Sequence, residues 1–196
     1  MNRWCTCVGA LAAALPAVLG ACAQPASDEL LQGGLIPVSE HATPRGPDPS
    51  SDPGAIALQA VEDVSAYWRE TYPDVYGGPF EEVSGFFPYG PDTEPPPCGD
   101  PPPSYEEIAN NAFYCDGEDI IAWDEASFLP EVNETFGGFT VAIVIAHEFG
   151  HAIQARAGAI DRTVDLELQA DCFAGAWTAY VAEGDAPTFT PDDVNL

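Results

Sequence analysis

The segment from Phe139 to Ala157 constrains this chain most, because it is long, apolar and nearly free of helix-breaking residues. It predicts one continuous helix, which Gly158 can end in a left-handed conformation. Within it, residues 147–151 read HEFGH. The two histidines are four residues apart and therefore lie on one face of the helix, one turn apart, where both imidazoles can bind the same metal ion.

The residue types in this pattern suit zinc. A catalytic zinc ion usually has three protein ligands, and two histidines with one glutamate form a common set. We interpret His147 and His151 as two of these ligands. Glu148 follows His147 directly, so its carboxylate can polarise a zinc-bound water molecule. We interpret Glu148 as the catalytic general base.

A second helix is expected after a short connection, capped by Asp161 or Thr163 and running to about Ala182. Two helices joined so closely should be antiparallel neighbours. Glu167 and Asp171, four residues apart, share one face of this helix.

The antiparallel return can bring Glu167 level with His151, so we interpret Glu167 as the third metal ligand. Asp171 is expected to accept the other N–H of His147, as carboxylates commonly do for ligating imidazoles. The alternative is an exposed acidic face. The small apolar residues around the pair favour burial instead, and buried carboxylates need partners or a metal.

The HEFGH pattern and residues 167–175, ELQADCFAG, resemble the bacterial putative neutral zinc metallopeptidase family. The AFYC stretch at 112–115 and Cys98-Gly99 are also similar to it, and the resemblance covers roughly residues 54–190. It implies one Zn²⁺ per chain, bound by the two histidines and Glu167, with Glu148 catalytic. It also implies an α+β, mainly helical, zincin-like domain in which a strand lies beside the motif helix.

Further elements complete the expected domain. A helix should run from Asp52-Pro53 to about Thr71 and stop before Pro73. Residues 112–123 read as a β-hairpin turning at Asp116-Gly117, and this hairpin is our candidate for the strand beside the motif helix. Its edge could bind an extended peptide by strand addition. Tyr114 is our candidate for stabilising the oxyanion.

Chains of the resembled family usually continue beyond the point where this one stops. Thr190-Pro191 and the two acids after them form a helix start close to the last residue. We therefore expect this chain to be truncated at its C-terminus.

Three cysteines fall in the expected domain: Cys98, Cys115 and Cys172. We expect a Cys98–Cys115 disulfide, with Cys115–Cys172 as the alternative, because disulfides persist in an oxidising compartment. At most one pair can form among three cysteines. A cysteine ligand to zinc is disfavoured because the two histidines and the glutamate already complete the set.

Residues 1–22 read as a lipoprotein signal peptide. The apolar run is shorter than the roughly 20 residues that span a bilayer, and it ends in Leu19-Gly20-Ala21-Cys22, which is similar to a bacterial lipobox. Cys22 is the expected lipidation site. The proline-rich residues 23–53 are expected to form a flexible tether, and residues 54–196 the domain that it holds. We expect a secreted lipoprotein on the outer face of the membrane, held by this anchor only.

The charge balance narrows the possible partners. The chain has 32 acidic residues against five basic ones, all arginine, and a formal net charge of −27. This argues against nucleic-acid binding, which needs clustered basic side chains. We expect a zinc metallopeptidase acting on peptides or proteins. The alternatives are a zinc-binding structural lipoprotein without turnover, and a zinc hydrolase of a non-peptide amide.

Overall fold

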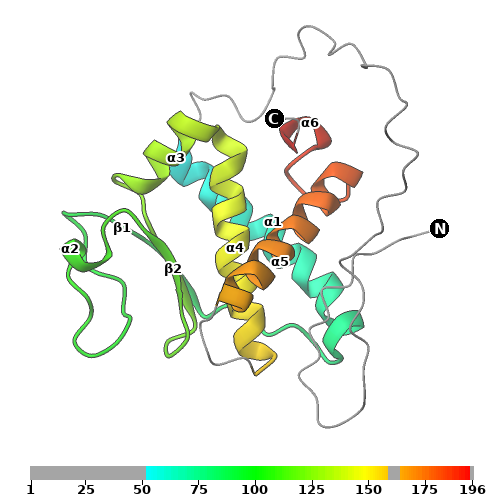
Figure 1. Ribbon diagram of the computed structural model, residues 1–196, viewed down its shortest axis with the longest axis horizontal. Helices are drawn as coiled ribbons and strands as arrows, with labels where there is room; N and C mark the ends of the chain where they lie inside the picture. Colours follow the sequence, from blue (N-terminus) through cyan, green and yellow to red (C-terminus); the bar gives the residue numbers. More distant parts are fainter. Residues whose placement is uncertain (1–51, 159–163, 195–196) are drawn as a thin grey trace, which may run out of the picture. The chain divides into compact units, whose positions relative to one another are not determined.

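The computed structural model describes residues 52–158 and 164–194. Over these residues the fold is α+β and mainly helical, with six helices and one small mixed sheet, which confirms the predicted class. The order is α1 (Pro53–Tyr76), β1 (Gly85–Tyr89), α2 (Tyr105–Ile108), β2 (Ala112–Cys115), β3 (Ile120–Asp124), α3 (Phe128–Phe136), α4 (Gly138–Arg156), α5 (Val164–Glu183) and α6 (Pro191–Val194) (Figure 1).

The signal peptide, nearly all of the tether and both proposed caps of the second helix lie outside the described residues. Within the described ranges, no helix is long and apolar enough to cross a membrane.

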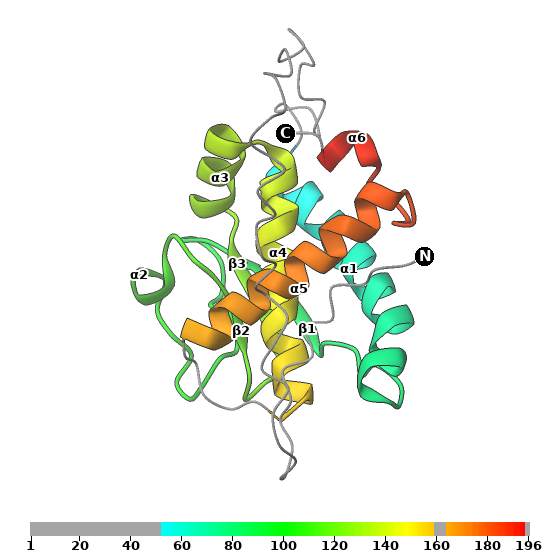
Figure 2. The ribbon, with the colours of Figure 1, turned by 45° about the vertical axis from the view of Figure 1, so that its right-hand side comes forward.

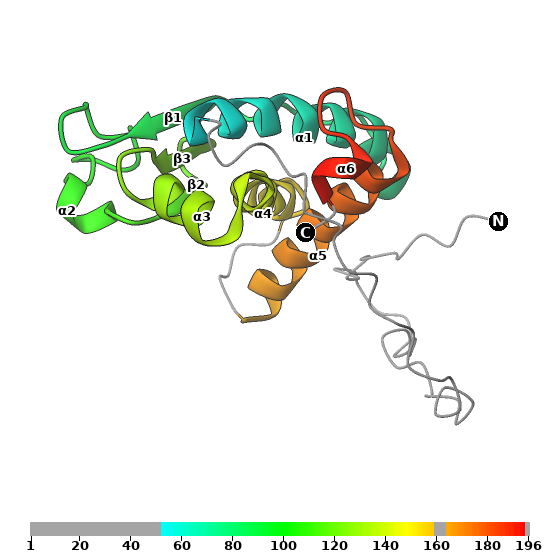
Figure 3. The same cartoon turned by 90° about the horizontal axis from the view of Figure 1, so that it is seen from above.

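Helix α4 is the central element of the domain. It packs against α1, α3, α5 and β2, and Figure 3 shows it between α1 and α5. Its side chains are buried on most of its circumference, including Val141, Ile145, Phe149 and Ile153. A helix that is apolar nearly all round is stable only where neighbours cover it, so the motif helix must lie in the core.

Helix α5 follows α4 in the reverse direction and crosses it (Figure 2). Its buried stripe consists of Ala170, Ala174, Trp177 and Val181, together with Phe173. The Trp177 ring stacks on Phe139 of α4 with centroids 5.6 Å apart. The predicted antiparallel pair is therefore present, and one apolar stripe fixes which face of α5 is turned to the core.

The sheet has the strand order β1-β3-β2. Strand β3 is central and buried along its whole length, with β1 parallel to it and β2 antiparallel. Strand β1 is not among the elements predicted from the sequence. Pro88 is tolerated there because β1 is an edge strand and need not donate on its outer side.

The predicted hairpin exists, but its turn is longer than predicted. Residues 116–119 form the turn and β3 begins at Ile120. The prediction of a two-residue turn at Asp116-Gly117 is therefore wrong. Asp119 adopts a left-handed φ of 52°, which aspartate tolerates better than most residues. Its carboxylate also accepts hydrogen bonds from Ser84 and Tyr114, and these contacts stabilise the wider turn.

Helix α1 extends beyond its predicted end at Thr71 and contains Pro73. A proline inside a helix loses one backbone hydrogen bond. Here Tyr76 packs on Tyr72 one turn earlier, with ring centroids 4.8 Å apart, and Gly77 N–H donates to the Pro73 carbonyl. These contacts offset the cost, so the prediction that the proline stops the helix is wrong.

The predicted Cys98–Cys115 disulfide is confirmed. It joins the proline-rich loop to the end of β2. The alternative Cys115–Cys172 pairing is wrong, because Cys115 is already bonded to Cys98.

Candidate metal centre

The site is built where α4 and α5 cross. His147 and His151 project from α4, and Glu167 projects from the first turns of α5. Oε2 of Glu167 lies 3.3 Å from Nε2 of His147 and 3.4 Å from Nε2 of His151. One potential ligand atom from each of the three residues lies within 4.8 Å of the other two. The arrangement can hold one metal ion.

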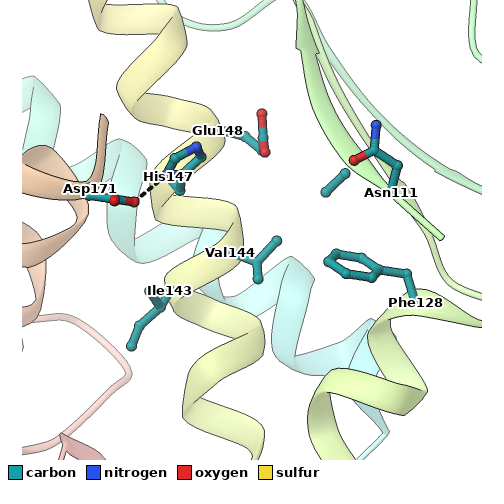
Figure 4. A pocket seen from close by; sticks show the side chains of 8 residues that line it. Asn111, Phe128, Ile143, Val144, His147, Glu148 and Asp171 are labelled. Carbon is teal, nitrogen blue, oxygen red and sulfur yellow. Dashed lines mark hydrogen bonds and ion pairs between the residues drawn. The ribbon is translucent and has the colours of Figure 1, made fainter. Parts of the chain in front are cut away.

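The second nitrogen of each imidazole is engaged by another side chain. Nδ1 of His147 lies 2.8 Å from the carboxylate of Asp171, the contact that the helical spacing predicts (Figure 4). Nδ1 of His151 lies 2.9 Å from Oε1 of Gln154. Both partners act as acceptors, so each Nδ1 carries the proton. Each Nε2 is then unprotonated, as a metal ligand must be.

Gln154 links the two helices. Its Nε2 donates to the Leu166 carbonyl at 2.6 Å and to Oε1 of Gln169 at 3.2 Å. Because the amide nitrogen is used there, the amide oxygen faces His151. The turn of α5 that carries Glu167 is thereby joined to the ring of His151.

The donor set fits zinc. Imidazole nitrogen and carboxylate oxygen are common zinc ligands, and the atoms bound to a tetrahedral zinc ion lie about 3.3 to 3.6 Å apart. The distances from the Glu167 oxygen to the two imidazole nitrogens, 3.3 and 3.4 Å, fall in that range.

Gly150 sets how closely the two helices approach. A Cβ atom at this position would lie 2.8 Å from Cα and 3.0 Å from Cβ of Ala170. Ordinary carbon–carbon contacts are about 3.5 to 4.0 Å, so only glycine fits here. Ala170 stands between Glu167 and Asp171 in the sequence, and this contact brings both carboxylates within reach of the histidines.

Glu148 and Asp171 of α5 lie on opposite sides of His147 (Figure 4). The side chain of Glu148 is buried, with the residue 7% exposed, and it lines a cleft of about 280 Å³ together with His147. Figure 4 shows its carboxylate facing Asn111 across this cleft. A buried carboxylate beside the metal group is placed to exchange a proton with a water molecule there.

The prediction that Glu167 and Asp171 are buried is wrong. Their side chains are 48% and 66% exposed. The apolar neighbours that suggested burial, such as Ala170 and Phe173, lie on the stripe of α5 that faces the core. The two acids lie on the flank of that stripe, where they reach the histidines from the solvent side.

Tyr114 does not reach the cleft. Its hydroxyl donates to Asp119 at 2.8 Å, near the C-terminal end of α4, and Tyr114 is not among the residues that line the cleft. Burial and the neighbouring Asp119 carboxylate raise the pKa of Tyr114 to about 12, although Arg156 acts in the opposite direction. Its assignment to the oxyanion is therefore wrong.

The wall of the cleft opposite α4 is held by Tyr89 and Asp124. The Tyr89 hydroxyl lies 2.8 Å from the Asn111 carbonyl, which also accepts from the backbone N–H of Asp124 at 2.9 Å. Burial, with a further contribution from the charge of Asp124, raises the pKa of Tyr89, so the phenol stays a donor.

The Asp124 carboxylate is itself buried and accepts from Ser127 and from the backbone N–H groups of Asn110 and Ala126. Burial alone would raise its pKa, but these donors outweigh burial and keep the pKa below the usual range.

Two residues at the site were missed in the sequence analysis. Gln154 follows His151 by three residues, which is one turn of the same helix face, so helical spacing alone could have indicated it. Asn111 directly precedes the AFYC strand. No local signal marks it, because its place at the cleft depends on how the sheet packs against α4.

The fold and the site thus define a protein with a candidate metal-binding group on two crossing helices, beside a three-stranded sheet. Residues 97–196 match the sequence family described as Putative neutral zinc metallopeptidase, and the chain belongs to this family. No solved structure matches the chain.

Two relatives illustrate the similarity. Uncharacterized protein Rv2575 of Mycobacterium tuberculosis is 31% identical over 99 residues, which are 43% of this chain and 32% of that protein. Uncharacterized protein YpfJ of Escherichia coli K12 is 34% identical over 84 residues, which are 33% of this chain and 29% of that protein. The match thus spans about a third of the length of these relatives.

Proposed function

We propose that this protein is a zinc-dependent metallopeptidase. The observation that carries the proposal is the meeting of Nε2 of His147, Nε2 of His151 and Oε2 of Glu167 beside the buried Glu148. Membership of the zinc metallopeptidase family supports the same reading.

In this proposal His147, His151 and Glu167 hold one zinc ion. Asp171 and Gln154 keep the two imidazoles in the tautomer that binds metal, and they restrain ring rotation. When bound, zinc lowers the pKa of a coordinated water molecule to near 7 and polarises the substrate carbonyl.

Glu148 performs the proton transfers. Its carboxylate accepts a proton from the water molecule as the oxygen attacks the peptide carbonyl, and then gives that proton to the nitrogen of the leaving amine. Water and the peptide bond are consumed, and a carboxylate and an amine are formed. A purely structural zinc site would need no carboxylate at this position, which favours turnover over a structural role.

Strand β2 supports a peptide as the substrate. It is an edge strand of the described sheet, and its first residue, Ala112, lines the cleft beside Glu148. An extended peptide can pair with such an edge through main-chain hydrogen bonds. We propose that peptide or protein substrates bind along it.

We further propose that the protein is a secreted bacterial lipoprotein, anchored through Cys22 on the outer face of the membrane. The support is the lipobox-like sequence alone. Replacing Cys22 with Ala should release the protein from the membrane fraction. Retention of the variant in that fraction would reject the anchor.

The first test is the zinc content of the purified protein by elemental mass spectrometry, next to two variants. Wild type should hold about one zinc per chain, and Glu167→Ala should lose most of it. Asp165→Ala removes another exposed acid from the first turn of α5 and should retain it. Wild type that folds but takes up no zinc would reject the proposal.

The second test separates a peptidase from a non-catalytic zinc protein. Glu148→Gln should keep zinc and lose cleavage of a peptide library that wild type cleaves in a chelator-sensitive way. Zinc-loaded wild type that cleaves no peptide would favour the structural alternative or a non-peptide amide as substrate. A fully active Glu148→Gln variant would reject the role of Glu148.

A further inference from the structure

The cleft beside Glu148 has an apolar interior. Besides His147 and Glu148, it is lined by Asn111, Ala112, Phe128, Ile143, Val144 and Asp171. In Figure 4 the side chains of Phe128 and Val144 point toward one another, below the gap between Glu148 and Asn111. The polar groups and the apolar groups thus occupy different parts of the cleft lining in this view.

Three apolar residues of this cleft, Phe128, Ile143 and Val144, are only partly covered. Ile143 and Val144 are half-buried, whereas Val141 and Ile145 on the same helix are fully buried. Phe128 is half-buried as well. Half-exposed apolar side chains gathered in one concave place gain free energy when an apolar group covers them.

The size of the cleft limits what can fill it. Its volume of about 280 Å³ lies just below the roughly 300 to 1,000 Å³ that is typical of sites for whole small molecules. It therefore accommodates one large side chain rather than a complete cofactor. The acidic groups Glu148 and Asp171, which both line the cleft, disfavour a side chain that is itself negatively charged.

Asn111 in the cleft lining also offers a contact for a peptide main chain. The backbone of Asn111 is fixed by Tyr89 and Asp124, whereas the described contacts include no hydrogen bond from its side-chain amide. An amide has both donors and an acceptor, which matches a peptide main chain. A peptide that pairs with β2 would pass this amide as it reaches Glu148.

We infer that the cleft is the specificity subsite of the enzyme and takes a large apolar side chain next to the scissile bond of a peptide. The inference rests on the proposed peptidase function. Phe128, Val144 and Ala112 form the contact surface for that side chain, and Asn111 holds the adjoining peptide group.

The first test is a cleavage profile. Wild type should prefer leucine or phenylalanine over aspartate at one position next to the cleaved bond, by about tenfold or more in kcat/KM. Phe128→Ala should reduce that preference severalfold, and Phe128→Leu should restore most of it. Phe136→Ala is the matched control, because Phe136 lies on the same helix, is 64% exposed and does not line the cleft.

The second test does not depend on turnover. In the Glu148→Gln protein, the methyl NMR signals of Ile143 and Val144 should shift on titration with N-acetyl-leucinamide and not with N-acetyl-aspartamide at equal concentration. The signals of the buried residues Val141 and Ile145 serve as the internal reference. Phe128→Ala should weaken the leucinamide response.

The outcomes separate the two proposals. Cleavage without an apolar preference, a preference for lysine or arginine, or a preference unchanged in Phe128→Ala would overturn the subsite and leave the peptidase function standing. Equal methyl shifts with both amides, or none with either, would also overturn the subsite. Leucinamide-specific shifts without any peptide cleavage would support an apolar binding cleft but reject the peptidase function, and with it the role of the cleft as a specificity subsite.

Discussion

Replacing Gly150 with alanine tests whether the close approach of α4 and α5 builds the metal centre. The added Cβ would lie 2.8 Å from Cα and 3.1 Å from the carbonyl oxygen of Ala170. Both of these Ala170 atoms belong to the backbone, so they cannot move aside as the end of a flexible side chain could. Relief to a normal contact of about 3.5 Å therefore requires the helices to separate locally by several tenths of an ångström.

The helix propensity of alanine and the steric clash with Ala170 change the free energy of unfolding in opposite directions. Alanine is favoured over glycine inside a helix by about 0.5 to 1 kcal/mol, whereas overpacking a close contact costs about 1 to 3 kcal/mol. The difference between these ranges is a net loss of about 0 to 2.5 kcal/mol in the free energy of unfolding of the metal-free protein, and we expect about 1 kcal/mol.

The same displacement should also weaken zinc binding. A metal site tolerates errors of about 0.2 Å in its ligand distances, so a displacement of several tenths of an ångström weakens the bond to Glu167. We expect zinc affinity to fall at least about tenfold, which corresponds to about 1.4 kcal/mol.

The assay is competition for zinc with a chromophoric chelator, next to thermal unfolding of the metal-free protein. Gly175→Ala is the matched control: Gly175 is in α5, and a Cβ there would meet nothing within 4 Å. This control should keep full zinc affinity and gain about 0.5 to 1 kcal/mol in stability. A Gly150→Ala protein with wild-type zinc affinity and unchanged stability would refute the reasoning.

Three further predictions follow from the contacts around the site. Gln154→Leu removes the acceptor for Nδ1 of His151 and should weaken zinc binding about 10- to 100-fold, with a changed tautomer in imidazole ¹⁵N NMR spectra; an unchanged tautomer would contradict the role of Gln154. The pKa of Asp124 is lowered by folding, so its stabilisation is present above the unfolded pKa of about 4 and is lost as the pH falls through the folded value. Denaturant unfolding of Asp124→Asn should therefore show lower stability than wild type at pH 7 and a smaller decline toward pH 2; parallel pH profiles would contradict this. The Cys98–Cys115 disulfide spans 17 residues, so replacing both cysteines with serine should cost about 2 to 4 kcal/mol in the free energy of unfolding, and a loss below about 0.5 kcal/mol would show that the loop needs no cross-link.

Much of the helical framework is readable from the sequence, because a helix is defined by local hydrogen bonds and local periodicity. The run predicted at 139–157 is α4, which differs by one residue at each end. The four-residue spacing of the histidines, and of Glu167 and Asp171, places each pair on one face before any tertiary contact is known.

The strands and the turns were harder to predict for a physical reason. Strand β1 pairs with β3 across a separation of 35 residues, as in the pair Gly85–Ile120, and no short-range pattern encodes that partner. The wide turn at Asp119 depends on Ser84, which is equally distant along the chain.

By itself, the sequence determined that two imidazoles and a carboxylate lie on α4 and that an acidic pair lies on the helix after it. Only the tertiary structure decided that these groups meet, since their distance depends on the contact between Gly150 and Ala170. It also decided that Glu167 and Asp171 are exposed, that Gln154 holds His151, and that Asn111 faces Glu148. The periodicity of a helix fixes the direction of a side chain, whereas packing between elements fixes what that side chain reaches.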